Sequence, residues 1–142
     1  MNTQLQNALV LAGRILLALI FIFAGFDKIA HYAGNAGYMA SAGMPLINIL
    51  LPLAILFELG GGLAIAFGWK TRWAAAALCL FMVPVTLVFH AFWSSPPDQA
   101  QMQMIHFMKN LAIMGGMLAL AAFGPGAWAL ERGKTTARPE IS

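Results

Sequence analysis

Four stretches of about twenty apolar residues constrain this chain more than any other feature. They run over about residues 8–26, 46–67, 73–93 and 104–123. About 20 residues at a rise of roughly 1.5 Å per residue cross a hydrocarbon core of about 30 Å. Because a helix satisfies its own backbone hydrogen bonds in lipid, helices are the expected form of such stretches. The sequence therefore predicts an all-α fold, a four-helix transmembrane bundle.

The composition agrees with a membrane protein and excludes several other classes. Hydrophobic residues make up 61% of the 142 residues and charged residues only 9%, against roughly a quarter charged in soluble domains. This excludes a disordered chain, and no nucleic-acid partner is expected. The single cysteine, Cys79, cannot form an internal disulfide, a CxxC centre or a thiolate cage.

The distribution of Lys and Arg predicts the orientation in the bilayer. With four spans, both ends of the chain and the second connection share one side, which carries Lys70, Arg72, Arg132, Lys134 and Arg138. The positive-inside rule then places both termini in the cytoplasm. The first stretch has no preceding cation and no small-residue cleavage site, so we expect a retained helix and not a signal peptide.

The connections complete the expected organisation. Residues 28–45 are rich in small and apolar side chains, which favours a short amphipathic segment at the outer surface between helices 1 and 2. We expect a single membrane domain over residues 1–132. Residues 133–142 are polar and without an apolar period, which predicts a disordered cytoplasmic tail.

Three charged residues lie inside the apolar stretches: Arg14, Glu58 and Lys109. A charge within a span costs about 2.5–3.5 kcal/mol on insertion scales, so such residues are expected to face one another and often serve function. From their depths along the helices we expect a buried ion pair between Arg14 and Glu58, with Lys109 approaching Glu58 from the outer side. The alternative is that the pair only fixes helix register while Lys109 extends to the surface.

Polar residues near these charges define a candidate ligand site in the outer half of the bundle. Gly61 and Gly62 share a face with Glu58 and permit close approach of a helix or ligand. His106, Lys109 and Asn110 share a face of the fourth helix, and His90 lies near the outer end of the third. Two histidines without a further motif do not predict a haem, and no metal site is expected.

Several segments together resemble the DoxX family of small bacterial inner-membrane proteins. They are RILLALIFIFAGFDKI (14–29), YMASAGMP (38–45), ELGGGLAIAFGWKTR (58–72), FHAFW (89–93) and FMKNLAIMGGMLALAAFGPG (107–126). The resemblance implies a four-helix membrane bundle with cytoplasmic termini. It also implies association with membrane oxidoreductase systems, including thiosulfate:quinone oxidoreduction and catechol or quinone detoxification, while more distant relatives are cargo receptors of the eukaryotic secretory pathway. It supplies no catalytic residue.

Two hypotheses about function follow. The first is a membrane component of a redox system that binds a quinone or a similar small amphipathic molecule between its helices. The second is a non-catalytic scaffold that anchors a membrane or soluble oxidoreductase. A transport module is disfavoured because there is no evident inverted repeat. The lipid bilayer is the expected partner and a homo-oligomer is compatible, whereas the sequence leaves catalysis and the identity of the cofactor open.

Overall fold

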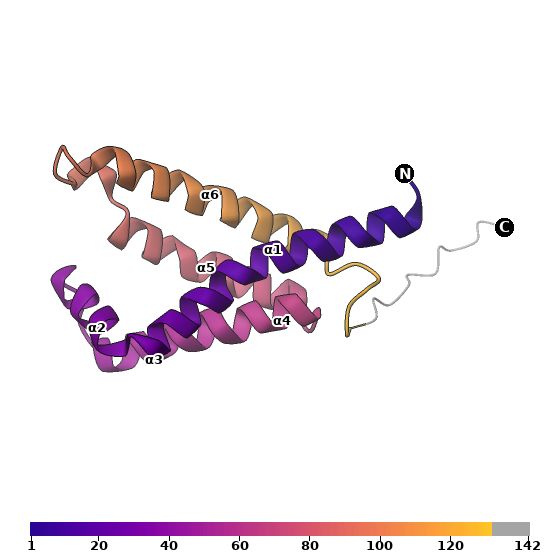
Figure 1. Cartoon of the computed structure of the whole chain (residues 1–142), viewed down its shortest axis with the longest axis horizontal. Helices are drawn as coiled ribbons and strands as arrows, with labels where there is room; N and C mark the ends of the chain where they lie inside the picture. Colours follow the sequence, from indigo (N-terminus) through magenta and orange to yellow (C-terminus); the bar gives the residue numbers. More distant parts are fainter. Residues whose placement is uncertain (132–142) are drawn as a thin grey trace.

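The fold, seen in a computed structural model that describes residues 1–131, is a bundle of helices (Figure 1). In chain order its elements are α1 (Thr3–Ala30), α2 (Tyr32–Ser41), α3 (Ile47–Ile55), the π-helical turn η1 (Leu56–Gly60), α4 (Gly61–Phe67), α5 (Thr71–Phe89), the 3₁₀ turn η2 (Phe92–Ser94) and α6 (Ala100–Phe123). The elements α3, η1 and α4 form one continuous second span.

The predicted all-α fold class is confirmed. Four helical spans are long and apolar enough to cross a membrane: Thr3–Ala30, Ile47–Phe67, Thr71–Ser94 and Ala100–Phe123. The short helix predicted between the first two spans is α2. The predicted tail, residues 133–142, lies outside the described residues.

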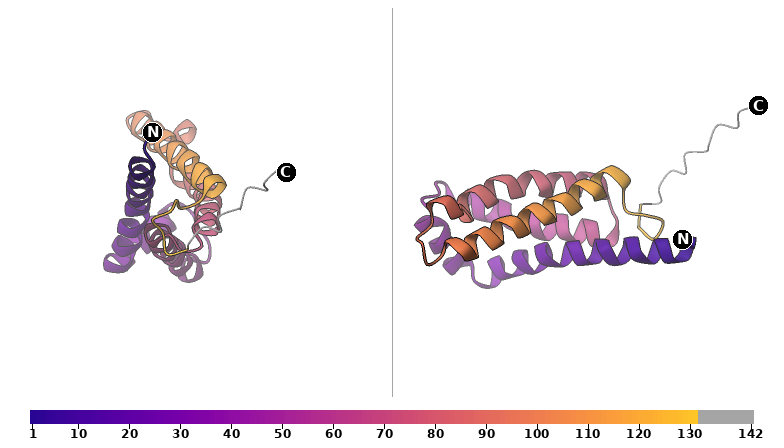
Figure 2. Two further views of the ribbon diagram at one scale, coloured as in Figure 1. Left: turned by 90° about the vertical axis from the view of Figure 1, so that its right-hand side faces the viewer. Right: turned by 90° about the horizontal axis from the view of Figure 1, so that it is seen from above.

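The chain reverses direction between the spans, so the connections gather at two opposite ends of the bundle. The start of α1 and residue 131 lie at one end, which we call the terminal end, while α2 and η2 lie at the other, the α2 end (Figures 1 and 2). Gly68 stops α4 with a φ of 72°, a conformation that suits glycine. Two prolines, Pro96 and Pro97, follow η2 before α6 begins.

The second span packs closely on α1 through glycine. A Cβ atom on Gly62 would lie 2.9 Å from Ile22 Cγ1, and one on Gly25 would lie 2.8 Å from Leu59 Cβ. Without side chains at these positions the two backbones can approach, which is the usual basis of helix association in lipid. The contacts also set the antiparallel register of α1 against the second span.

Buried apolar side chains from all four spans form one core. It contains Ala18, Phe21, Ile65, Ala75, Leu78, Met82, Met117 and Leu120. Large apolar side chains also cover the outside of the bundle, including Leu16, Leu80 and Phe123, which are 69%, 73% and 86% exposed. Such a surface is suited to contact with acyl chains.

The C-terminal segment, residues 124–131, folds back across the terminal end and is held by Arg14. The Arg14 guanidinium is buried and donates hydrogen bonds to the backbone carbonyls of Pro125, Trp128 and Ala66. Backbone hydrogen bonds from Leu130 to Phe67 and from Glu131 to Gly68 extend the attachment. Arg14 therefore connects α1, α4 and the C-terminal segment.

The second span is irregular where it passes the middle of the bundle. Pro52 lies within α3 and has no N–H for the helical hydrogen-bond ladder. The π-helical turn η1 follows and contains Glu58, which is 6% exposed. Wide turns of this kind occur often at functional sites. Glu58, the one charged residue of η1, is therefore a candidate site residue.

The helix α2 is tied to the end of α1 by polar contacts. His31 Nδ1 lies 2.9 Å from Asp27 Oδ1, and Asn35 Nδ2 donates to Asp27 Oδ2 at 3.2 Å. The chain turns sharply between the two helices, and α2 folds over the end of the bundle (Figure 1). This placement makes α2 one wall of the cavity described next.

Candidate ligand pocket beside an ion pair

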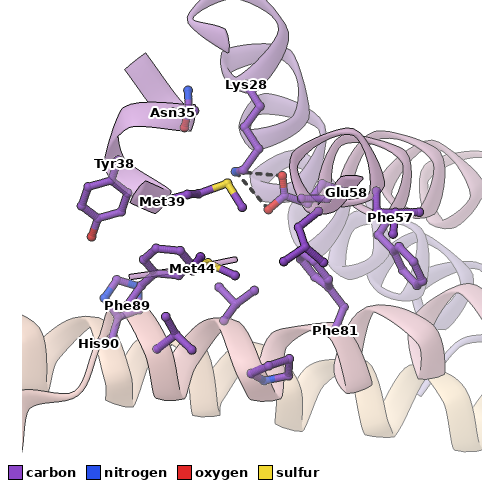
Figure 3. Close-up of a pocket in the computed structure, with 16 residues that line it drawn as sticks. Lys28, Asn35, Tyr38, Met39, Met44, Phe57, Glu58, Phe81, Phe89 and His90 are labelled. Atoms are coloured by element: carbon purple, nitrogen blue, oxygen red, sulfur yellow. Dashed lines mark hydrogen bonds and ion pairs between the residues drawn. The ribbon is translucent and has the colours of Figure 1, made fainter. Parts of the chain in front are cut away.

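A pocket of about 550 Å³ lies between α2, the second span and α5 (Figure 3). Its walls are mainly apolar and are formed by Met39, Met44, Leu50, Leu53, Ala54, Phe57, Phe81, Pro84, Val85, Val88 and Phe89. Its polar lining consists of Lys28, Asn35, Tyr38, Glu58 and His90. Ligand sites in proteins commonly have this volume and this combination of an apolar wall with a few polar groups.

Two aromatic stacks span the pocket from its other walls to α5. Phe57 of η1 stacks on Phe81 of α5 with ring centroids 5.6 Å apart, and Tyr38 of α2 stacks on Phe89 of α5 at 5.2 Å. The α5 residues between these stacks, Pro84, Val85 and Val88, line the pocket. Among the described residues α2 and α3 make no close backbone approach to α5, so side chains alone close this side.

A partly buried ion pair between Lys28 and Glu58 lies at the pocket wall. Lys28 Nζ donates to Glu58 Oε1 at 3.2 Å and lies 2.9 Å from Oε2. Oε2 is thus paired with the ammonium electrostatically, but it is buried and receives no directed hydrogen bond. The Glu58 side chain is 8% exposed and that of Lys28 is 23% exposed. Such a pair contributes little net stability, but removing one partner alone commonly costs about 3–5 kcal/mol.

The ion pair predicted between Arg14 and Glu58 is not formed. Glu58 pairs with Lys28, and Arg14 donates to backbone carbonyls at the terminal end. The helix register explains the difference, because Gly25 lies against Leu59 while Arg14 lies beside Gly68. From Arg14 to Lys28 is about 21 Å along a helix at roughly 1.5 Å per residue.

The two predicted glycines serve helix packing. A Cβ atom on Gly61 would lie 2.9 Å from Leu78 Cδ1, and Gly62 lies against Ile22. Neither glycine lines the pocket. The close approach expected at these positions is therefore made by helices α5 and α1.

The predicted polar residues of α5 and α6 form a neighbouring group of which only His90 lines the pocket. His90 Nδ1 lies 2.8 Å from Gln103 Oε1, and the His90 and His106 rings are 5.2 Å apart. Lys109 Nζ lies 3.4 Å from His106 Nδ1 on an exposed part of α6, and does not join Glu58.

Asn110 instead links two helices. Its Nδ2 donates to Thr86 Oγ1 at 3.0 Å, and both residues are buried between α5 and α6.

Within residues 1–131 no group of three or more His, Cys, Asp or Glu side chains could hold a metal ion.

Of the residues that line the pocket, sequence reasoning named only Glu58 and His90; the polar residues that it missed are Lys28, Asn35 and Tyr38. Lys28 lies two residues after the first apolar stretch, so the sequence indicated a residue at the membrane interface and not a residue of the site. The one signal that could have found it is the small-residue match of Gly25 and Gly62, which fixes the antiparallel register.

The fold and the pocket define a class, that of small multi-pass membrane proteins with a ligand-sized cavity between their helices. The sequence then gives the family: the family model DoxX matches residues 9–91, and the chain belongs to the DoxX family. No solved structure is significantly similar to it.

Two bacterial relatives match almost from end to end. The chain is 43% identical to the inner membrane protein YqjF of Escherichia coli over 91% of this chain and 94% of the relative. It is 36% identical to the inner membrane protein YphA of the same organism, over 89% of this chain and 91% of the relative. The protein is thus a multi-pass inner-membrane protein.

A eukaryotic relative is more distant. The Surfeit locus protein 4 homolog of Schizosaccharomyces pombe is 29% identical over 87% of this chain, which corresponds to 37% of that longer protein.

Proposed function

We propose that this protein is the membrane component of a redox system and holds a quinone or a similar small amphipathic molecule in the pocket. The observation that carries the proposal is the combination of a cavity of about 550 Å³, an apolar wall and the partly buried Lys28–Glu58 pair. An apolar ring suits the wall, and a polar ring substituent suits the charged pair. Polar groups this deep in a membrane protein are costly and are usually kept for function.

The pocket is suited to exchange with the bilayer. Leu53, Phe57 and Val88 line it and are 43%, 39% and 44% exposed. In a membrane these side chains meet acyl chains, so a molecule dissolved in lipid reaches the pocket between the second span and α5 without crossing water.

The first test is to fill the pocket. In Val85→Phe the larger ring enters the cavity from α5, and binding of decylubiquinone, in its oxidised and reduced forms, should fall at least tenfold in lipid nanodiscs. Val83→Phe is the matched control, because Val83 lies on the same helix, is exposed and does not line the pocket. Equal affinity in the two variants would contradict a ligand at this place.

The same preparation tests the redox role. Mass spectrometry of the purified protein should find a copurified ring compound, at lower occupancy in Val85→Phe. A protein that carries no small molecule, binds neither probe and retains a partner enzyme would support the scaffold instead.

We also infer that both termini face the cytoplasm. Lys70 lies between α4 and α5 at the terminal end, and Arg72 lies in the first turn of α5. The positive-inside rule assigns such an end to the cytoplasm. The pocket and α2 then lie toward the outer leaflet.

A further inference from the structure

We propose that the preferred occupant of the pocket is a ring compound with a free hydroxyl group, such as a quinol or another alkylated phenol, recognised by the Lys28–Glu58 pair. The inference rests on the proposed function and narrows its ligand class. It starts from the unequal positions of the two carboxylate oxygens. Oε1 receives a directed hydrogen bond from Lys28, whereas the buried Oε2 is in ion-pair contact with Lys28 Nζ at 2.9 Å and receives no directed hydrogen bond.

The Glu58 carboxylate therefore retains an unused acceptor at the pocket. A carboxylate offers about four lone-pair sites, and Lys28 occupies one with good geometry. Buried polar atoms in proteins nearly always have a partner. A ligand that donates a hydrogen bond would supply the partner that Oε2 lacks.

Lys28 retains hydrogen-bond donors that complement this acceptor. Its ammonium group has three N–H donors, and among residues 1–131 the only hydrogen-bond acceptor recorded for it is Glu58. Lys28 also lines the pocket. An N–H that is free of Glu58 can donate to an oxygen of the ligand.

A hydroxyl group matches both requirements at once, because its oxygen accepts from Lys28 while its hydrogen is donated to Glu58 Oε2. A quinone carbonyl or an ether only accepts, and would bring its lone pairs beside the carboxylate. A ligand ion of either sign would be attracted by one member of the pair and repelled by the other, so the pair gives no preference for a charged ligand. A neutral hydroxyl combines the required donor and acceptor in one atom, which suits two pair members this close together.

Met39 lies beside the ion pair (Figure 3). Its side chain extends from α2 and ends beside Lys28 and Glu58 (Figure 3), and the residue is 7% exposed. Methionine is unbranched and adapts its shape readily, so it can move aside for a ring hydroxyl.

The test compares three small probes that differ in one group: 4-propylphenol, 4-propylanisole and 1-fluoro-4-propylbenzene. The anisole replaces the hydroxyl hydrogen by methyl, and the fluoro compound removes the donor without added bulk. In nanodiscs the phenol should bind at least tenfold more tightly than either of the others. Equal affinities would overturn the hydroxyl preference and leave the proposed function standing. If no probe binds, and decylubiquinone and its quinol do not bind either, the proposed function fails as well.

The ion pair is tested by the double variant Lys28→Met/Glu58→Met. Replacing both charges by apolar side chains of similar length avoids an unpaired buried charge, and such exchanges are often tolerated. The variant should still bind the three probes but lose the tenfold preference for the phenol. Lys109→Met is the control, because it makes the same change on the exposed face of α6. A double variant that keeps the preference would overturn the role of the pair.

The last arm identifies the source of the ligand as the lipid phase. The comparison is repeated with 4-dodecylphenol and 4-dodecylanisole, whose chains can extend through the exposed side between the second span and α5. We expect the same preference for the hydroxyl at equal mole fraction in lipid. Binding of the propyl but not the dodecyl phenol would overturn a membrane source in favour of a short phenol from water.

Discussion

At the scale of single residues, three charges inside or beside the spans have two separate tasks. Lys28 and Glu58 form an ion pair at the pocket, while Arg14 holds backbone carbonyls at the opposite end of the bundle. A cation thus lines the pocket in one place and attaches the C-terminal segment in the other. Their separation makes the two tasks testable by mutation.

Arg14→Gln should destabilise the protein without affecting the pocket. The substitution leaves the carbonyls of Pro125 and Trp128 without their donor, and a buried group left unsatisfied costs about 1–3 kcal/mol. We expect a lower thermal unfolding midpoint in detergent and unchanged probe affinity in nanodiscs at low temperature. Lys70→Gln, at an exposed position of the same end, should change neither quantity. A loss of probe affinity in Arg14→Gln at unchanged stability would indicate coupling to Glu58 after all.

At the scale of helices, glycine contacts decide which residues face each other. The close approach of α1 and the second span at Gly25 and Gly62 fixes a register in which Glu58 lies near Lys28. Pro52 and the wide turn η1 then make the second span irregular beside the pocket. The candidate site is consequently a product of helix packing as much as of its polar residues.

Gly62→Ala should separate α1 from α4. Its Cβ would lie 2.9 Å from Ile22 Cγ1 and 3.1 Å from the Ile22 backbone nitrogen, so the backbone must shift. Overpacking of this kind costs about 1–3 kcal/mol, and the unfolding midpoint should fall. Gly115→Ala on α6 is the control, because nothing lies within 4 Å of the added atom. It should be neutral or slightly stabilising, since alanine favours helix by roughly 0.5–1 kcal/mol over glycine. Equal midpoints in the two variants would argue against the packing of α1 on α4.

At the scale of the whole molecule, the bundle has a closed terminal end and a hollowed α2 end. The C-terminal segment crosses the terminal end and is attached to α1 and α4, whereas the pocket occupies the space between α2, the second span and α5. If the termini face the cytoplasm, as inferred, the pocket opens in the outer half of the membrane.

Reporter fusions test this orientation. A reporter after Ala42, which follows α2, should signal the outer compartment, and one after Ser142 should signal the cytoplasm. The two fusions control for each other, because a reporter active in one compartment is silent in the other. The reverse pattern would invert the topology and place the pocket toward the inner leaflet.

The sequence by itself determined the spans, their number and the helix between the first two. The reason is that lipid imposes a length and requires the backbone to satisfy its own hydrogen bonds, and both conditions act locally along the chain. It also marked Glu58 and His90, which do line the pocket. Only the tertiary structure decided that Glu58 pairs with Lys28 and that Lys109 stays on an exposed face. Those outcomes depend on the register between helices, which is set by close contacts at Gly25 and Gly62 and cannot be read from the depth of a single charge within its own span.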